Sequence, residues 1–331
     1  MNMNDGAPIS LRVTLMAGAS GLSTTLPDIP LGPGQWTQIG RVLSGPGYSD
    51  GFATVQLVSG PGPFYAYAVF NDNVTSDGSY VPARAFDWAE PQILPVLVES
   101  GTYRSELILT NPYYQPVTAT LTYVESLSPA GGAGGVAAES FLPQEQKIIP
   151  DALNYLRGKG VSIGAEGAAS YAGVLSITFT RLGATAFAFA GARTAAPAPG
   201  GGEYGLFYTA WGLHETVGDE TWIFGLQQNS TNRSNLAVLS AGDGGPVTYR
   251  LDVYDGDTGQ LAGSSAVMNL APGGWFQFSP LLPAFGIANG YARVVRLSGT
   301  SRILAYGVVN DGATPACCGT NDGSYVAMAN H

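Results

Sequence analysis

Leu31-Gly-Pro-Gly-Gln-Trp-Thr-Gln38 returns later in the chain as Leu270-Ala-Pro-Gly-Gly-Trp-Phe-Gln277. The match runs without a gap from Leu31 to Asp72 at a constant offset of 239 residues, and 17 of the 42 positions are identical. After a six-residue insertion, Asp77-Gly-Ser-Tyr-Val81 recurs as Asp322-Gly-Ser-Tyr-Val326. A degenerate third copy lies between them, where Ser105-Glu-Leu-Ile-Leu109 corresponds to Ser234-Asn-Leu-Ala-Val238. Self-similarity at a fixed period is typical of repeat proteins, so we expect three tandem units.

Each copy has the pattern of short strands separated by turns. The run from Val247 to Val253 alternates apolar and polar residues, as a half-buried antiparallel strand requires, and the turn residues Asp255 to Gly259 follow it. The only helix signal is Pro150 to Arg157. About eight strands per unit predict an all-β chain of three antiparallel β-sandwich units, Greek-key or jelly-roll-like. Shifts in composition at Arg84–Pro91 and Ala195–Gly202 suggest linkers, and we place the units at residues 1–92, 93–203 and 204–331.

The first unit is shorter than the other two. The second and third units begin with two strands each, whereas the first opens at Ile9–Leu15, which corresponds to the third strand. Residues 1–8 are too few and too polar to replace two strands. We therefore expect the first sandwich to expose unpaired strand edges, which are templates for β-strand addition. Either the chain is an excerpt of a longer array, or a neighbouring molecule, such as another copy of the chain, supplies the strands.

The composition narrows the classes of partner. Only 11% of the residues are charged, the formal net charge is −10, and Lys147 and Lys159 are the two lysines. Because nucleic-acid binding depends on clustered Lys and Arg, we expect no nucleic-acid partner. The apolar stretch from Gly173 to Ala192 is interrupted by Arg181-Leu-Gly183 and has the pattern of two strands about a turn, so we expect no insertion into a membrane.

Several stretches resemble a known class of module. In the middle unit these are SELILTN (105–111), VTATLTYVES (117–126) and FLPQEQKIIPDALNYLR (141–157), and in the outer units AYAVFNDNVTSDGSYVPA (66–83) and AYGVVNDGATPACCGTNDGSYVAMA (305–329). They resemble tandem β-sandwich modules of large secreted or surface-attached bacterial proteins. The resemblance implies an extracellular or cell-surface, non-catalytic module and assigns no functional residue. The middle unit has Ala190-Gly-Ala-Arg-Thr194 where the outer units have an Asn-Asp strand end.

Candidate catalytic residues lack the context that catalysis needs. Gly47-Tyr-Ser-Asp-Gly51 matches a nucleophile-elbow pattern, but no helix signal follows Ser49 and the third copy has Ala288 at that position. His214 has no evident partner and is expected on a linker surface. For a glycan hydrolase with two carboxylates, the middle unit offers Glu residues of which only one, Glu106, is expected inside a strand. We therefore expect no enzyme.

The Asn-Asp loops and the two cysteines are the remaining polar candidates. Asp72 and Asp77, with their counterparts Asp311 and Asp322, concentrate oxygen atoms that could bind calcium, although Asx-turns explain the same residues. No other cofactor is expected. Cys317 and Cys318 lie in the six-residue insertion and could form a vicinal disulfide, remain free thiols, or link two chains.

Aromatic residues suggest the alternative to a purely structural role. Trp36 and Trp275 recur at equivalent positions, which favours packing over ligand binding. Tyr113 and Tyr114 stand between prolines and could present rings to a polysaccharide. The leading hypothesis is a non-catalytic extracellular structural or adhesive array, for instance a subunit of a surface filament or appendage. The alternatives are a carbohydrate-binding module and, after it, a glycan-active hydrolase.

Overall fold

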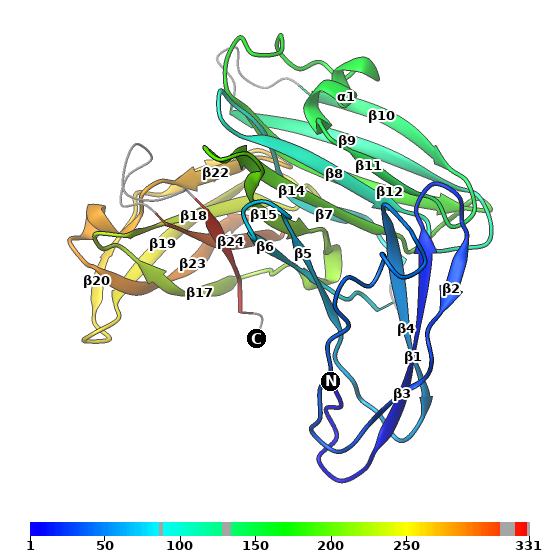
Figure 1. Ribbon diagram of the computed structural model, residues 1–331. Coiled ribbons are helices and arrows are strands. Elements are labelled where there is room, and N and C mark those ends of the chain that lie inside the picture. The colour runs from blue at the N-terminus through cyan, green and yellow to red at the C-terminus, as the bar shows by residue number, and fades with distance from the viewer. Residues whose placement is uncertain (86–88, 128–133, 312–321, 330–331) are drawn as a thin grey trace.

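The computed structural model describes residues 1–85, 89–127, 134–311 and 322–329 (Figure 1). Apart from one short α-helix and two 3-10 turns, the regular elements of these residues are β-strands, and every pair of adjacent strands is antiparallel. The predicted all-β, sandwich-like fold is therefore confirmed. Figure 1 shows strands of the middle repeat at the top and those of the last repeat at the left. Strands β1 to β4 of the first repeat extend away from the rest at the right, and β5 and β6 lie in the centre beside β15.

The middle repeat forms two layers. One layer has the order β10-β9-β12-β7 and the other β11-β8-β14-β15, and the two are joined where Glu99 pairs with Arg104 at the β7–β8 turn. The small helix α1 packs Leu153 and Leu156 against this core. The elements are β7 (Gln92–Glu99), β8 (Arg104–Thr110), β9 (Val117–Leu127), β10 (Gly134–Phe141), β11 (Gln146–Ile149), α1 (Ala152–Gly158), β12 (Tyr171–Arg181), β13 (Ala184–Thr185), β14 (Phe189–Pro197) and β15 (Glu203–Thr209).

The last repeat has the same arrangement. Its layers are β17-β23-β19-β20, with β21 also on β19, and β22-β18-β24-β25. The hairpin β17–β18 thus corresponds to β7–β8, with β17 in one layer and β18 in the other. The elements are β16 (Trp211–Gly212), η1 (Leu213–Glu215), β17 (Glu220–Gln227), β18 (Asn232–Ser240), β19 (Val247–Asp255), β20 (Leu261–Ser264), β21 (Met268–Leu270), β22 (Trp275–Phe278), η2 (Leu282–Phe285), β23 (Asn289–Gly299), β24 (Ile303–Asp311) and β25 (Gly323–Ala327).

The first repeat is open. Its strands are β1 (Ile9–Ala17), β2 (Ser23–Thr25), β3 (Ile29–Leu31), β4 (Gly51–Ser59), β5 (Tyr67–Asn71) and β6 (Gly78–Pro82). β1 pairs with β2, β3 and β4, whereas β5 and β6 form a separate hairpin. Within the described residues, no strand precedes β1 to take the places that β17 and β18 take in the last repeat. The expectation that the first unit lacks its two initial strands therefore matches the observed topology.

The predicted linker at Ala195–Gly202 is wrong. Its first three residues are the end of β14, and the rest is a tight turn into β15, which pairs with β14 from Gly191 to Pro197. The Pro- and Gly-rich composition reflects a hairpin turn, because such residues mark turns within a sheet as well as linkers. A boundary at 203/204 therefore separates β15 from its hydrogen-bonding partner.

The buried core is continuous across the middle and last repeats. One cluster of buried apolar side chains extends from Ile93 to Met328, whereas the buried cluster of the first repeat consists of Ile9, Leu11 and Leu31. Trp275 packs against the large cluster, but Trp36, which was expected to pack in the same way, is 65% exposed. The reason is topological: Trp275 pairs with β18, whereas no strand lies beside Trp36 in the place of β18.

Two tyrosines at the same position of the repeat provide a test of this difference. Tyr306 is 1% exposed and its counterpart Tyr67 is 53% exposed. Because truncating a buried aromatic side chain leaves a cavity, we expect Tyr306→Ala to lower the free energy of unfolding by about 3–5 kcal/mol. Tyr67→Ala should lower it by about 1 kcal/mol. Urea unfolding followed by circular dichroism measures both values, and equal losses would contradict an open first repeat.

Candidate functional site

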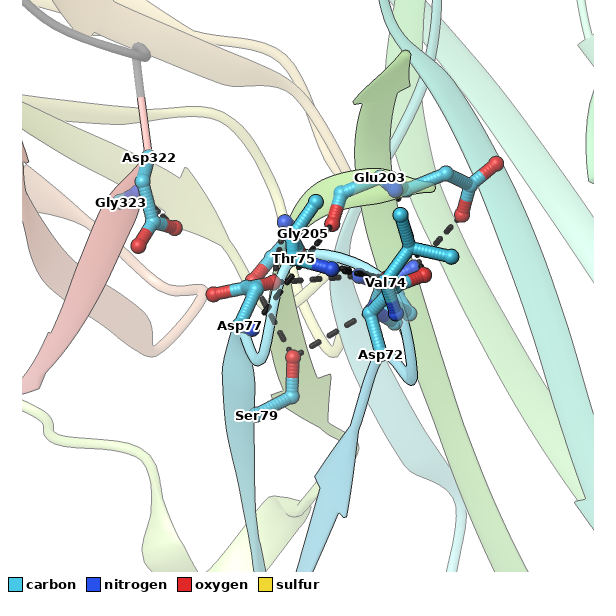
Figure 2. A network of polar contacts seen from close by, with 10 residues as sticks. Asp72, Val74, Thr75, Asp77, Ser79, Glu203, Gly205, Asp322 and Gly323 are labelled. Atoms are coloured by element: carbon cyan, nitrogen blue, oxygen red, sulfur yellow. Dashed lines mark hydrogen bonds and ion pairs between the residues drawn. The ribbon is translucent and has the colours of Figure 1, made fainter. Parts of the chain in front are cut away.

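Some of the polar residues selected from the sequence, Asp72, Asp77 and Asp322, lie where the β5–β6 hairpin contacts the other two repeats (Figure 2). Asp72 organises the turn of the hairpin: its Oδ1 accepts hydrogen bonds from the backbone N–H groups of Val74 and Thr75, both at 2.8 Å. These bonds lower the pKa of the Asp72 carboxyl. Its Oδ2 accepts a bond from the backbone N–H of Glu203, at 3.2 Å, so the same side chain also holds the hairpin against the start of β15.

Asp77 and Arg193 form the ion pair at the centre of this junction. Asp77 Oδ2 lies 3.2 Å from Arg193 Nη2 and accepts a hydrogen bond from the backbone N–H of Gly205 at 2.8 Å. Arg193 is 6% exposed, and its Nη1 donates to Glu203 at 2.7 Å. Ser79 adds a hydrogen bond from its hydroxyl to the Gly205 carbonyl, at 3.1 Å. The hairpin of the first repeat is thus fixed to β14 and β15 by a buried cation and its anionic partners.

Arg193 was missed as an interface residue although the sequence carried a signal. Arg193 of β14 pairs with Phe207 of β15, and at the same position of the last repeat Val308 of β24 pairs with Tyr325 of β25. The middle repeat therefore has arginine where the last repeat has valine. The departure at Ala190–Thr194 was visible as a break in the pattern. Its meaning depended on which side chain of another repeat lay opposite, and that is a tertiary contact.

Asp322 brings the third repeat to the same junction. Figure 2 shows Asp322 and Gly323 at the start of β25, on the side of the hairpin that carries Asp77. Burial, the charge of Asp77 and that of Asp311 raise the pKa of Asp322 to about 6. Asp311 is also adjacent, since its Oδ1 accepts a hydrogen bond from the Asp322 backbone N–H at 2.7 Å.

The four aspartates selected for calcium are therefore only partly brought together. Asp77, Asp311 and Asp322 interact at one end of β25, whereas Asp72 accepts hydrogen bonds from its own turn and from the start of β15. Within the described ranges, no group of three or more His, Cys, Asp or Glu side chains has an arrangement that could hold a metal ion. Calcium binding remains a prediction. Cys317 and Cys318 lie outside the described residues.

The remaining candidates are dispersed over the molecule. The Tyr113 ring lies 4.0 Å from the Arg181 guanidinium, whereas Tyr114 is 83% exposed. The Ser49 hydroxyl donates to Asp50 at 3.1 Å in an exposed turn. His214 is paired with Glu90, a partner that the sequence did not indicate, because 124 residues separate them.

Glu99 and Glu139 of the middle repeat take part in structural ion pairs. Glu125 and Glu139 lie within β9 and β10, so the expectation that only Glu106 sits inside a strand is wrong. Glu99 is bound to Arg157 at 2.5 Å beside helix α1. Burial opposes ionisation of Glu139, but hydrogen bonds from Lys147, Lys159 and Tyr155 prevail and lower its pKa to about 2.

Comparisons with known proteins assign no family: no protein-family model and no curated protein matches the chain. In the described part of the chain, no helix has the length and apolar character needed to cross a bilayer.

The raised pKa of Asp322 predicts a pH dependence of stability. A carboxyl whose pKa rises on folding, here from an ordinary value of about 3.9 to about 6, holds its proton more tightly in the folded state. Its contribution to stability is therefore full below about pH 4 and is lost as the pH rises through about 6.

Asp322→Asn should remove this dependence. We expect the variant and the native chain to have the same free energy of unfolding near pH 4. At pH 7.5 that of the variant should be higher by about 1 kcal/mol; the difference is small because the carboxyl is only half buried. Asp5→Asn removes one carboxylate from an exposed loop and is the control. Chemical unfolding at several pH values gives the comparison, and parallel curves for the native and Asp322→Asn chains would contradict it.

The Arg193 pair predicts a selective effect on the hairpin. Arg193→Val installs the residue of the last repeat but leaves Asp77 without its cation, so docking of β5–β6 should weaken by about 3–5 kcal/mol. Hydrogen exchange of the amides from residue 67 to 82 measures this loss. Arg104→Val, which removes an exposed ion pair, should cost less than about 1 kcal/mol. Adding Asp77→Asn to Arg193→Val should recover part of the protection; no recovery would mean that the charge of Asp77 is not the cause.

Proposed function

We propose that the chain is a non-catalytic structural element of an extracellular or cell-surface array, built from sandwich repeats that bind one another head to tail. The observation that carries the proposal is a contact that occurs twice between the same two positions of successive repeats. At the start of β11, the backbone N–H of Gln146 donates to the Gly18 carbonyl just beyond β1, at 2.9 Å. At the start of β22, the backbone N–H of Trp275 donates to the Ser126 hydroxyl near the end of β9, also at 2.9 Å.

These two contacts join equivalent parts of successive repeats. β11 and β22 occupy the same edge of their layers, and β1 and β9 are corresponding strands. A second repeated contact lies at the junction, where β15 contacts two equivalent strands of the other repeats. Asp77 and Ser79 join it to β6, and the edge-to-face rings of Tyr208 and Tyr325 join it to β25. Contacts of this kind use different surfaces on the two partners, so the same pair of surfaces can be used again by further units.

The surroundings of the polar side chains support a structural role. Two of the glutamates of the middle repeat that a hydrolase could use are bound to cations, in the pairs Glu99–Arg157 and Glu139–Lys147. The buried charges of the junction join repeats, with Arg193 reaching Asp77 of another repeat. An extracellular location is supported by the resemblance of the repeats to modules of secreted proteins and by the low lysine content.

Immunogold electron microscopy of the source cells tests the proposal. Antibodies raised against the purified chain should label the cell surface or extracellular fibres, and antibody absorbed with the purified chain should label neither. Brief protease treatment of intact cells should remove the label together with the protein. Label confined to the cell interior and resistant to that treatment would overturn the proposal.

A further inference from the structure

Aromatic side chains gather on the outer face of the last repeat. Inward residues of β17, β23 and β19, such as Ile223, Ala292 and Val253, are fully buried, so the residues that alternate with them point away from the core. Four of these outward residues are aromatic and come from three adjacent strands, which lie at the left of Figure 1: Trp222 and Phe224 of β17, Tyr291 of β23 and Tyr254 of β19.

The four rings form one continuous cluster. The rings of Tyr254 and Tyr291 have an interplanar angle of 2° and centroids 5.1 Å apart, and the angle between Trp222 and Phe224 is 5°. Trp222 joins the two pairs, since its ring lies 5.5 Å from that of Tyr254 and 5.9 Å from that of Tyr291. Phe224 is 50% exposed, and the other three side chains are partly exposed. The sheet therefore presents a set of aromatic rings that hold one another in place.

Two ion pairs border this aromatic cluster. Arg293, whose guanidinium lies 5.8 Å from the Trp222 ring, donates from Nε to Glu220 at 2.9 Å. On β19, Arg250 donates from Nε to Asp252 at 2.8 Å, and Asp252 is the register partner of Arg293. The two cations and the two anions cancel. The border thus offers hydrogen-bond donors and acceptors without a net charge, which suits a ligand rich in hydroxyl groups.

The middle repeat has different chemistry on the same face. Strand register places aliphatic residues at the positions of three of the rings: Ile93, Val124 and Val174. Ile93 and Val174 are buried, and Gly273 of the last repeat lies so close to Val124 that a Cβ on Gly273 would be 3.0 Å from the valine side chain. The last repeat therefore contacts this face of the middle repeat through aliphatic side chains.

We propose that the outer face of β17, β23 and β19 is a binding site for a neutral polysaccharide. A sugar ring has an apolar C–H face, which stacks on aromatic rings, and hydroxyl groups at its edge, which bond to the bordering Arg and carboxylate groups. A further repeat is the other occupant that this face suggests. The middle repeat meets its neighbour with aliphatic residues, however, and the last repeat has rings and ion pairs in their place. The site adds a binding function to the structural role and does not depend on it.

Binding of the intact chain to polysaccharides tests the proposal. The neutral probes are laminarin, xyloglucan, galactomannan and arabinoxylan in affinity gel electrophoresis, and cellulose and chitin in pull-down; alginate is the acidic comparison. We expect at least one neutral probe to bind more tightly than alginate. Trp222→Ala and Tyr291→Ala should each weaken that binding by about tenfold or more, because central aromatic side chains carry much of the energy of an interface. Trp222→Phe keeps a ring and should retain most of the affinity.

Tyr114→Ala and Trp36→Ala are the matched controls, because each removes an exposed ring from another repeat and should leave binding unchanged. Phe224→Ala, which truncates the most exposed ring of the cluster, gives the same test if Trp222→Ala does not fold.

Three outcomes would overturn the proposal. They are binding to none of the neutral probes, binding that is kept in the Trp222, Tyr291 and Phe224 variants but lost in Tyr114→Ala, and self-association of the chain that the cluster variants abolish while polysaccharide binding is unchanged. These measurements use purified protein, so their failure is distinct from a failure of the cell-surface labelling.

Discussion

The central strands β8 and β18 are the elements on which the sandwich repeats depend. Each hydrogen-bonds to strands on both sides while its inward side chains face the opposite layer; Leu107 and Leu236 are two of these side chains and are fully buried. A strand in this position satisfies its own backbone groups and those of both neighbours. Where it is missing, as in the first repeat, β5 and residues 36–39 separate and the facing layer loses its apolar cover. The same sequence pattern therefore gives a closed sandwich in two repeats and an open one in the first.

Much of this architecture could be predicted from the sequence. Strand alternation and turn residues placed most of the strands of the last repeat, including Val247–Tyr254 within β19, because these signals are local. The absence of two strands in the first repeat followed from the alignment of the copies alone. The turn at Ala195–Gly202 was misread because composition does not show whether a turn joins two strands of one sheet or two domains.

The junction was harder to predict than the fold. Asp72, Asp77 and Asp322 were recognised as notable residues, but their partners are distant in sequence; Asp72 and Glu203, for example, are 131 residues apart. Arg193 could be given a role only once β14 was seen to face the hairpin of another repeat. Arg193 stands where the last repeat has Val308, and it binds the hairpin of another repeat, so one residue difference gives a repeated unit a contact specific to one pair of neighbours. A buried guanidinium with carboxylate partners is more selective than apolar contact, since a mismatched partner would leave a charge unpaired.

The continuous core of the middle and last repeats has a mechanical consequence. Tension applied between the two ends of the chain would act on a block from β7 to β25 and on a first repeat that is attached through the β5–β6 hairpin and the hydrogen bond between Gln146 and Gly18. The hairpin is fixed by a few charged contacts around Arg193, whereas the block is held by a shared apolar interior. Extension would therefore begin at the first repeat and leave the block intact. A chain built in this way takes up strain at one end while the other end keeps its shape.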